Sequence, residues 1–132
     1  MLSIADRMIV TLEEVHSKRV IHRDIKPENW CIGQGEDFNS IYLVDYGLSK
    51  VYENEEGEHI PMNGNKTMLS QAIFSSVNSH KQLEVSRRDD LESLVYMLML
   101  MVVGDLPWMK ILYPEKNSPS FSASKEQRLK IV

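Results

Sequence analysis

Residues 21–29 constrain this chain more than any other part of its sequence. They read Ile-His-Arg-Asp-Ile-Lys-Pro-Glu-Asn and fill the pattern H-R-D-x-x-x-x-N completely. The short run Asp45-Tyr46-Gly47 follows further along the chain. A carboxylate, an ammonium, a carboxamide and a second carboxylate therefore occur in fixed order on segments bounded by turn-forming residues.

Transfer of a γ-phosphoryl group to a hydroxyl leaves a protein little covalent chemistry to perform. It requires an acceptor for the hydroxyl proton, cations near the spreading negative charge, and oxygen ligands that hold Mg²⁺ on the phosphates. Asp24 can accept the proton and Lys26 can face the phosphate, while Asn29 and Asp45 can supply ligands. Each residue alone is an ordinary turn or solvated residue, so the combined spacing carries the prediction.

Apolar spacing predicts a helix over residues 3–17. Ile4, Met8, Leu12 and Val15 fall on one helical stripe. Ser3 stands where an N-cap is expected. The sequence therefore predicts an amphipathic helix just before the pattern that begins at His22.

Two short strands are predicted after that pattern, over residues 30–32 and 41–44. Residues 33–40 contain Gly33 and Gly35 and are typical of the turn in a hairpin. Such a hairpin holds Asn29 at one strand's start and Asp45 at the other's end. Asp24 and Asp45 can then face one pocket.

Residues 89–103 predict a second helix, which ends near Gly104 and Pro107. Because it is apolar all round from Leu94, we expect it to be buried on every side. Residues 50–68 are polar and acidic and predict an exposed, mobile segment. Residues 117–124 predict a loop, and residues 124–131 the beginning of another helix.

The composition excludes several classes of function. A net charge of −4 argues against a partner made of nucleic acid, which requires a basic surface. The longest apolar run, residues 94–103, is too short to span a bilayer, so no membrane partner is expected. The single cysteine, Cys31, permits no internal disulfide, and no secretory signal is visible. These features indicate an intracellular protein of the cytoplasm or nucleus.

The chain resembles the casein kinase 1 superfamily of serine/threonine protein kinases, which includes the tau-tubulin and vaccinia-related kinases. The resemblance rests on blocks at residues 16–29, 42–50 and 86–94, with Ser76-Val77-Asn78 and Leu106-Pro107-Trp108 beside them. Residues 102–108 are similar to the tau-tubulin branch, whereas Asp-Tyr-Gly is similar to the vaccinia-related branch. The resemblance therefore does not distinguish between these two branches of the superfamily.

The resemblance implies a protein-kinase-like α+β fold, with residues 1–132 forming a partial protein kinase domain. The expected part is the mostly α-helical C-terminal lobe with a small β-hairpin, and the N-terminal β lobe is absent. Residues 1–21 contain neither a glycine-rich phosphate loop nor the lysine of an early strand. Gly33-Gln34-Gly35 lies after the catalytic loop and is interpreted as a turn. We expect little activity without the missing lobe.

The resemblance also implies a role for each candidate residue. Asp24 would be the catalytic base and Lys26 would contact the γ-phosphate, whereas Asn29 and Asp45 would bind Mg²⁺. Cys31 replaces a leucine beneath the adenine of ATP, where a small buried hydrophobe is expected. Two further residues have supporting roles: Asp90 would brace the backbone of the catalytic loop, and His22 would be structural, packed in the core.

One departure from the family concerns the loop that faces the substrate. The family's Gly-Thr-Ala-Arg aligns with residues 70–73, which read Ser-Gln-Ala-Ile. Gln71 is longer than the usual threonine, and Ile73 cannot bind an anion as the usual arginine does. The sequence therefore predicts a weakened preference for phosphorylated substrates.

The predicted function is ATP-dependent and Mg²⁺-dependent phosphorylation of serine or threonine hydroxyls of a protein substrate. The alternative is a non-catalytic pseudokinase or protein-docking module, which the missing phosphate loop, Gln71 and Ile73 would favour. Against the alternative stands the joint presence of Asp24, Lys26, Asn29 and Asp45, because a docking surface has no physical need for that set.

Overall fold

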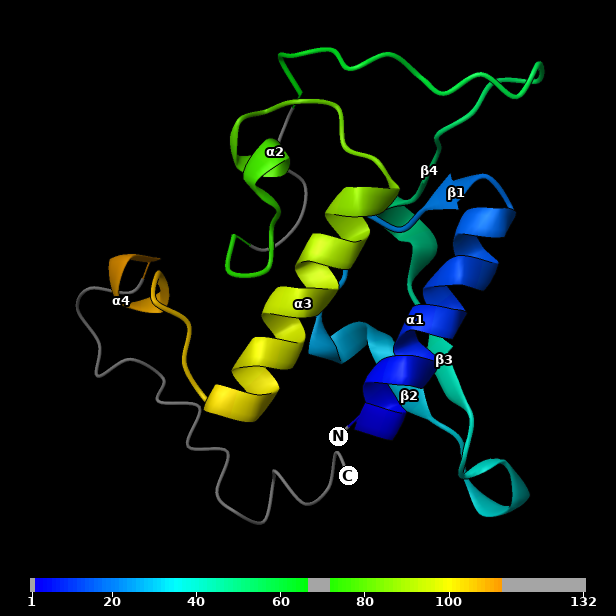
Figure 1. Ribbon diagram of the computed structural model, residues 1–132, viewed down its shortest axis with the longest axis vertical. Helices are drawn as coiled ribbons and strands as arrows, with labels where there is room; N and C mark the ends of the chain where they lie inside the picture. The colour runs from blue at the N-terminus through cyan, green and yellow to red at the C-terminus, as the bar shows by residue number, and fades with distance from the viewer. Residues whose placement is uncertain (1, 67–71, 113–132) are drawn as a thin grey trace.

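A computed structural model describes residues 2–66 and 72–112 of the chain (Figure 1). Its helices are α1 (Leu2–Ser17), α2 (Val77–His80), α3 (Arg87–Val103) and α4 (Met109–Leu112). Its strands are β1 (Val20–Ile21), β2 (Trp30–Ile32), β3 (Ile41–Leu43) and β4 (Lys50–Val51). The two long helices, α1 and α3, pack against each other, and the β2–β3 hairpin lies along α1.

Helix α1 confirms the predicted helix and its apolar stripe. Met8 and Leu12 are buried, and Ile4 and Val15 pack against the same cluster. The predicted N-cap is wrong, since the helix already includes Leu2 and Ser3 therefore lies within its first turn. The apolar stripe predicted the helix correctly although the cap was wrong, because burial of apolar area, rather than capping, stabilises this helix.

The hairpin is also as predicted, with β3 ending one residue early at Leu43. Trp30 pairs with Leu43 and Ile32 with Ile41 in an antiparallel ladder. Leu43 is buried, and the Thr11 hydroxyl donates to the Ile41 carbonyl at 3.3 Å. The inner face of the hairpin is thereby fixed to α1.

Residues 50–66 form the described part of the segment predicted to be exposed. Most of them are exposed, but the segment begins as β4, whose Val51 pairs with Val20 of β1. Tyr52 is only 2% exposed, and its hydroxyl donates to the His16 carbonyl at 2.8 Å. The prediction of a wholly exposed segment is therefore wrong at its start, because one aromatic side chain anchors it.

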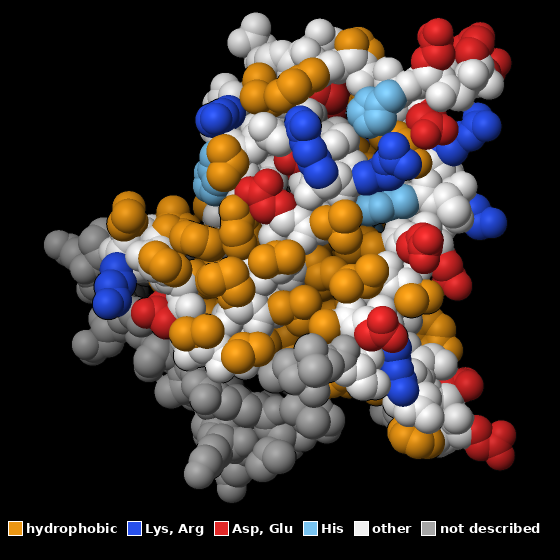
Figure 2. Space-filling view, viewed as in Figure 1, with side chains coloured by type: hydrophobic (Ala, Val, Ile, Leu, Met, Phe, Trp, Pro, Cys, Tyr) orange, Lys and Arg blue, Asp and Glu red, His pale blue; other side chains and the backbone are white. Residues whose placement is uncertain are grey.

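Helix α3 begins two residues earlier than predicted and ends where expected, at Gly104 with φ 82°. The expectation that it is buried on every side is wrong for the described residues. Val95 is 52% and Val102 63% exposed, and Figure 2 shows hydrophobic side chains gathering across this face. A helix with apolar residues on every face does not show how many of those faces other elements cover. The tertiary packing decides that number.

None of the helices within residues 2–66 and 72–112 combines the length and the hydropathy that a membrane span requires. The predicted loop at 117–124 and the predicted helix at 124–131 lie outside the described residues.

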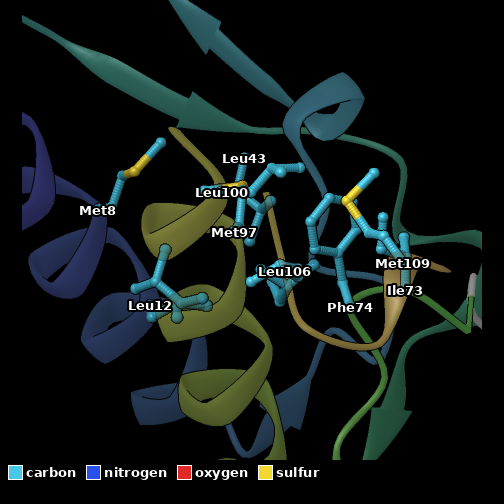
Figure 3. Close-up of a cluster of buried hydrophobic side chains, with 11 residues drawn as sticks. Met8, Leu12, Leu43, Ile73, Phe74, Met97, Leu100, Leu106 and Met109 are labelled. Carbon is cyan, nitrogen blue, oxygen red and sulfur yellow. The ribbon is translucent and has the colours of Figure 1, made fainter. Parts of the chain in front are cut away.

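The core joins the two long helices to the hairpin and to the segment around Phe74 (Figure 3). Met8 and Leu12 enter it from α1, and Met97 and Leu100 from α3. The remaining buried members are Ile25, Leu43, Ile73, Phe74, Leu94, Leu106 and Met109. This shared core sets the relative positions of the loops described below.

Leu94, 1% exposed in α3, provides a test of this core. We expect Leu94→Ala to lower the free energy of unfolding by about 2–5 kcal/mol, because it removes buried methyl groups and leaves a cavity. Val95→Ala, at the exposed neighbouring position, should change it by less than about 1 kcal/mol. Urea unfolding of both variants measures the difference, and equal losses would contradict this account of α3.

Candidate active site

The loop at residues 22–29 connects β1 to the hairpin, and a buried carboxylate from α3 holds its backbone. Asp90 is 2% exposed. One of its oxygens, Oδ2, accepts the His22 N–H at 2.8 Å, and the other, Oδ1, accepts the Arg23 N–H at 2.9 Å. These contacts confirm the prediction that Asp90 braces the backbone of this loop.

Arg23 adopts a conformation that few residues other than glycine adopt. Its φ is 68°, in the left-handed region, which costs roughly 1–2 kcal/mol for an L-residue. The bond from its N–H to Asp90 and the bond from its Nε to the Leu48 carbonyl both favour this conformation. The unusual backbone is thus fixed directly before Asp24.

Asp24, Lys26 and Asn29 converge as the sequence predicted. The Lys26 ammonium lies 2.6 Å from Oδ2 of Asp24, and the Asn29 amide nitrogen lies 3.2 Å from the same oxygen. The amide nitrogen of Asn29 also donates to the Asp24 carbonyl at 2.8 Å. Because Asp24 and Asn29 are 5% and 4% exposed, these contacts are shielded from water.

The electrostatics of the site centre on the Lys26 ammonium. Its hydrogen bond to Asp24 raises its pKa, an effect that burial opposes and that the charges of Asp24, Glu28 and Asp45 reinforce. Lys26 therefore remains charged at neutral pH.

Asp45 leaves the hairpin at the same end at which Asn29 enters it. The Val44 N–H donates to the Asn29 carbonyl at 2.9 Å, which fixes the two segments side by side. Asp45 is exposed, with φ 64°, and its Oδ1 accepts the Gly47 N–H at 3.3 Å. Asp45 therefore follows directly after the residue whose N–H bonds to Asn29, and the prediction that Asp24 and Asp45 face one pocket stays a prediction.

The donor atoms of Asn29 and Asp45 suit a hard divalent cation. Asn29 bonds to Asp24 through its side-chain nitrogen, so the amide oxygen is the atom that it can offer to a cation. Across the described ranges no three His, Cys, Asp or Glu side chains form a cluster that could hold a metal by themselves. One carboxylate and one amide oxygen fit Mg²⁺, which commonly takes its other ligands from phosphates and water.

Cys31 does not have the environment expected for it. It lies on β2 opposite Tyr42, and both side chains are exposed on the outer face of the hairpin. The prediction of a small buried hydrophobe is therefore wrong in this structure. Side chains alternate along a strand, and Leu43, not Cys31, points into the core.

His22 has the structural role that was expected. It is fully buried, its Nε2 lies 3.1 Å from the Val44 carbonyl, and its Nδ1 accepts the Asp24 N–H at 3.3 Å. The ring also contacts Tyr46 edge-on, with centroids 5.0 Å apart. His22 therefore links the loop of Asp24 to the loop of Asp45.

Asp89, the neighbour of Asp90, joins the start of α3 to the segment at residues 76–78. Its carboxylate accepts the Ser86 N–H at 2.7 Å, as in a capping box. It also accepts the Ser76 hydroxyl at 2.7 Å and the Asn78 amide at 2.9 Å. The start of α3 thus holds α2 on one side and the Asp24 loop on the other.

The sequence analysis missed a cluster of charges around the buried carboxylate of Glu84, whose two lysine partners are partly exposed. Glu84 is 7% exposed, and its two oxygens lie 2.9 Å from the Lys50 ammonium and 3.0 Å from that of Lys66. It joins both ends of the segment 50–66. It lies in a cavity of about 430 Å³ that Arg23 also lines, separate from the group formed by Asp24, Lys26 and Asn29.

Ile73, the residue in place of an arginine, is buried in the core at 8% exposure. Its carbonyl accepts the Trp108 indole N–H at 2.8 Å. An apolar, buried side chain offers nothing to an anion. Gln71, the other departure, lies outside the described residues.

The Glu84 cluster predicts a pH dependence of stability. Burial alone raises the pKa of Glu84, but the hydrogen bonds from Lys50 and Lys66 outweigh it and lower the pKa. A carboxyl whose pKa is lower in the folded protein stabilises the fold above its unfolded pKa, and this stabilisation is lost as the pH falls through the folded pKa. Glu84→Gln should therefore cost about 1.5–3 kcal/mol at pH 7.

Urea unfolding between pH 7 and pH 3 measures this difference between wild type and Glu84→Gln. The difference should shrink as the pH falls below about 4, where the carboxyl of unfolded chains titrates. Glu36→Gln, at an exposed position in the hairpin turn, serves as the control. If the difference in free energy of unfolding did not change with pH, the stabilisation could not come from the charge of Glu84.

The chain matches the model of a known protein family. The model of the family described as "Protein kinase domain" matches residues 1–129. The matched range includes the loop of Asp24, the turn at Asp45 and the whole of α3. The geometry and the family match therefore concern the same residues.

Proposed function

Because the chain belongs to the protein kinase family, we propose that it transfers the γ-phosphate of ATP to serine or threonine hydroxyls of a protein substrate, with Mg²⁺. The observation that carries this proposal is the convergence of the Lys26 ammonium and the Asn29 amide on one oxygen of Asp24. A buried carboxylate beside a cation and an amide suits the handling of a hydroxyl proton next to a phosphate.

In the proposed mechanism, Asp24 orients the substrate hydroxyl and accepts its proton. Lys26, which keeps its charge, faces the γ-phosphate and offsets its negative charge. Asn29 and Asp45 would hold Mg²⁺ through their side-chain oxygens, and the bound ion would neutralise the charge of the phosphates. The outer face of β2, including Cys31, would lie beneath the adenine.

We assign residues 1–132 to the mostly helical C-terminal lobe of a kinase domain of the casein kinase 1 group. The resemblance of the blocks around Asp24, Asp45 and Asp90 supports that subgroup. We place the protein inside the cell, in the cytoplasm or nucleus, without a nucleic-acid or membrane partner. The glycine-rich loop and strand lysine that the reaction needs would come from a further segment.

A weak preference for phosphorylated substrates forms part of this proposal. Ile73 is apolar and buried, and Lys50 and Lys66 are already paired with Glu84. Matched peptides with and without a phosphoserine near the acceptor should therefore differ by less than about tenfold in kcat/KM. A strong preference for the phosphorylated peptide would contradict this part of the proposal.

Phosphoryl transfer from radiolabelled ATP, measured with the whole protein that carries this sequence, tests the function. We expect label on serine or threonine, dependence on Mg²⁺, and loss of label in an Asp24→Asn variant. Label on tyrosine alone would contradict the assigned specificity. A folded protein that neither binds ATP nor transfers phosphate would favour the docking-module alternative.

Residues 1–132 by themselves should transfer phosphate far more slowly than the ~1–100 s⁻¹ typical of kinases. Correct positioning of the reactants contributes several powers of ten in rate, and the glycine-rich loop and strand lysine are not among these residues. The same radiolabel assay on the purified chain measures this. A rate within the typical range would contradict the need for a further segment.

A further inference from the structure

Met62 is the most exposed methionine within the described residues. It is 57% exposed, against 41% for Met99, whereas Met8, Met97 and Met109 are buried. A thioether sulfur that a peroxide can reach is oxidised to the sulfoxide, which turns an apolar side chain into a polar one. Met62 is therefore the methionine of this part of the chain that a peroxide in solution should oxidise first.

The Met62 sulfur faces a charged donor from another element. Nη2 of Arg88, in the first turn of α3, lies 3.8 Å from Sδ of Met62. Nε of the same guanidinium lies 3.6 Å from Oδ2 of Asp89. A thioether is only a weak acceptor, so this contact stabilises little as it stands. A sulfoxide oxygen carries a partial negative charge and would accept a charge-assisted hydrogen bond from the guanidinium.

The space beside the sulfur is large enough for the added oxygen. Met62 and Arg88 line a cavity of about 240 Å³ together with His59, Ile60 and Ser86. One water molecule takes up about 30 Å³ in the liquid, so a peroxide molecule fits beside the sulfur. The sulfur has two lone pairs, and the guanidinium contacts it from one side only. The other lone pair is therefore free to attack a peroxide.

The stretch at residues 62–66 is tied to the residues before α3 by two backbone hydrogen bonds. The Asn63 carbonyl accepts the Glu84 N–H at 2.7 Å, and the Lys66 N–H donates to the Gln82 carbonyl at 2.9 Å. An opening that separates this stretch from its neighbours must break both bonds and the contact between sulfur and guanidinium. A stronger contact at the sulfur therefore makes the opening rarer and slows hydrogen exchange at both amides.

We propose that Met62 is a modification site, oxidised by peroxide to the sulfoxide, and that the sulfoxide ties residues 62–66 more firmly to the start of α3 through Arg88. A lone pair of the sulfur attacks one peroxide oxygen, and the S–O bond forms as the O–O bond breaks. The other oxygen leaves as hydroxide and takes up the proton of the transferred oxygen to become water. The sulfur is oxidised by two electrons and the peroxide is reduced by two. The step does not depend on the proposed kinase function.

Peptide mass spectrometry of the 132-residue chain after brief treatment with hydrogen peroxide tests the site. We expect sulfoxide to form at Met62 at least tenfold faster than at Met97, which is 0% exposed. Met99 should be oxidised at an intermediate rate. In urea, where the chain is unfolded, the three rates should become equal. Oxidation of Met62 at less than three times the rate of Met97 in the folded chain would overturn the proposal.

Amide hydrogen exchange at Glu84 and Lys66 tests the consequence of the modification. Both amides should exchange at least threefold more slowly in the oxidised wild type than in the untreated chain. Met99→Leu is the matched control and should respond to peroxide as the wild type does, whereas Met62→Leu should not respond. Arg88→Ala should still be oxidised at Met62 but should show no slowing, because the donor to the sulfoxide is gone.

Met62→Gln separates the new acceptor from every other effect of peroxide, because it needs no oxidant. Its amide oxygen stands for the sulfoxide oxygen, so the two amides should exchange more slowly than in Met62→Leu. Arg88→Ala should abolish this difference. Faster exchange in the oxidised chain, slowing that persists in Arg88→Ala, or equal exchange in Met62→Gln and Met62→Leu would overturn the proposal. An inactive protein in the radiolabel assay would contradict the proposed function alone.

Discussion

Asp24→Asn should lower kcat for phosphoryl transfer by about 10²–10⁴-fold, the range that a positioned general base contributes. Asparagine has nearly the same shape as aspartate, but its amide cannot accept the proton of the substrate hydroxyl. It also removes the negative charge that the Lys26 ammonium contacts at 2.6 Å. We expect the fold to persist, because Asp90 and not Asp24 holds the backbone of the loop.

The measurement is steady-state kinetics on the whole protein, with urea unfolding to confirm that the variant is folded. Asp105→Asn, at an exposed position after α3, is the matched control and should retain activity within about twofold. An Asp24→Asn variant with at least a tenth of the wild-type kcat would remove Asp24 from the role of base. A variant that lost activity only by unfolding would show a structural role instead.

Asp90→Ala should destabilise the chain by about 3 kcal/mol or more, because three buried donors lose a charged acceptor and each unsatisfied group costs about 1–3 kcal/mol. The truncation leaves the N–H groups of His22 and Arg23 and the ring of His16 without their common acceptor. Each buried donor that lacks a partner costs free energy. The left-handed Arg23 would also lose the bond that favours it.

Urea unfolding of the chain measures this loss of stability, and two further variants serve as comparisons. Asp90→Asn keeps one carbonyl oxygen and should recover part of the stability, whereas Asp105→Ala at the exposed position should change it by less than about 0.5 kcal/mol. A loss below about 1 kcal/mol in Asp90→Ala would show that the loop is held by other contacts.

Local patterns predicted the secondary structure well. The stripe of Met8 and Leu12 indicated α1, and the hairpin followed from two short apolar runs around Gly33 and Gly35. These patterns work because apolar spacing reports directly on which face of an element must leave water. The same reasoning failed for the surroundings of α3, since an all-apolar helix does not reveal how many neighbours cover it.

Contacts within the candidate site could be predicted where the residues are close together in the sequence. They could not be predicted where the partner lies in a distant segment of the chain. Asp24, Lys26 and Asn29 lie within one short loop, so their contacts follow from the sequence pattern. The exposure of Cys31 depends on which face of the hairpin α1 covers. Tyr52 and Glu84 showed no signal beyond their residue type, although a single aromatic in an acidic segment could have indicated an anchor.

The sequence by itself determined the family, the chemical groups of the candidate site and the elements that carry them, because these reside in contiguous residues. Only the tertiary structure decided that Asp90 bonds to the backbone of residues 22 and 23 and that Glu84 joins both ends of residues 50–66. These contacts link residues far apart in the chain. Their free energy arises from burying charges together with their donors, and no local pattern encodes which distant partner will be present.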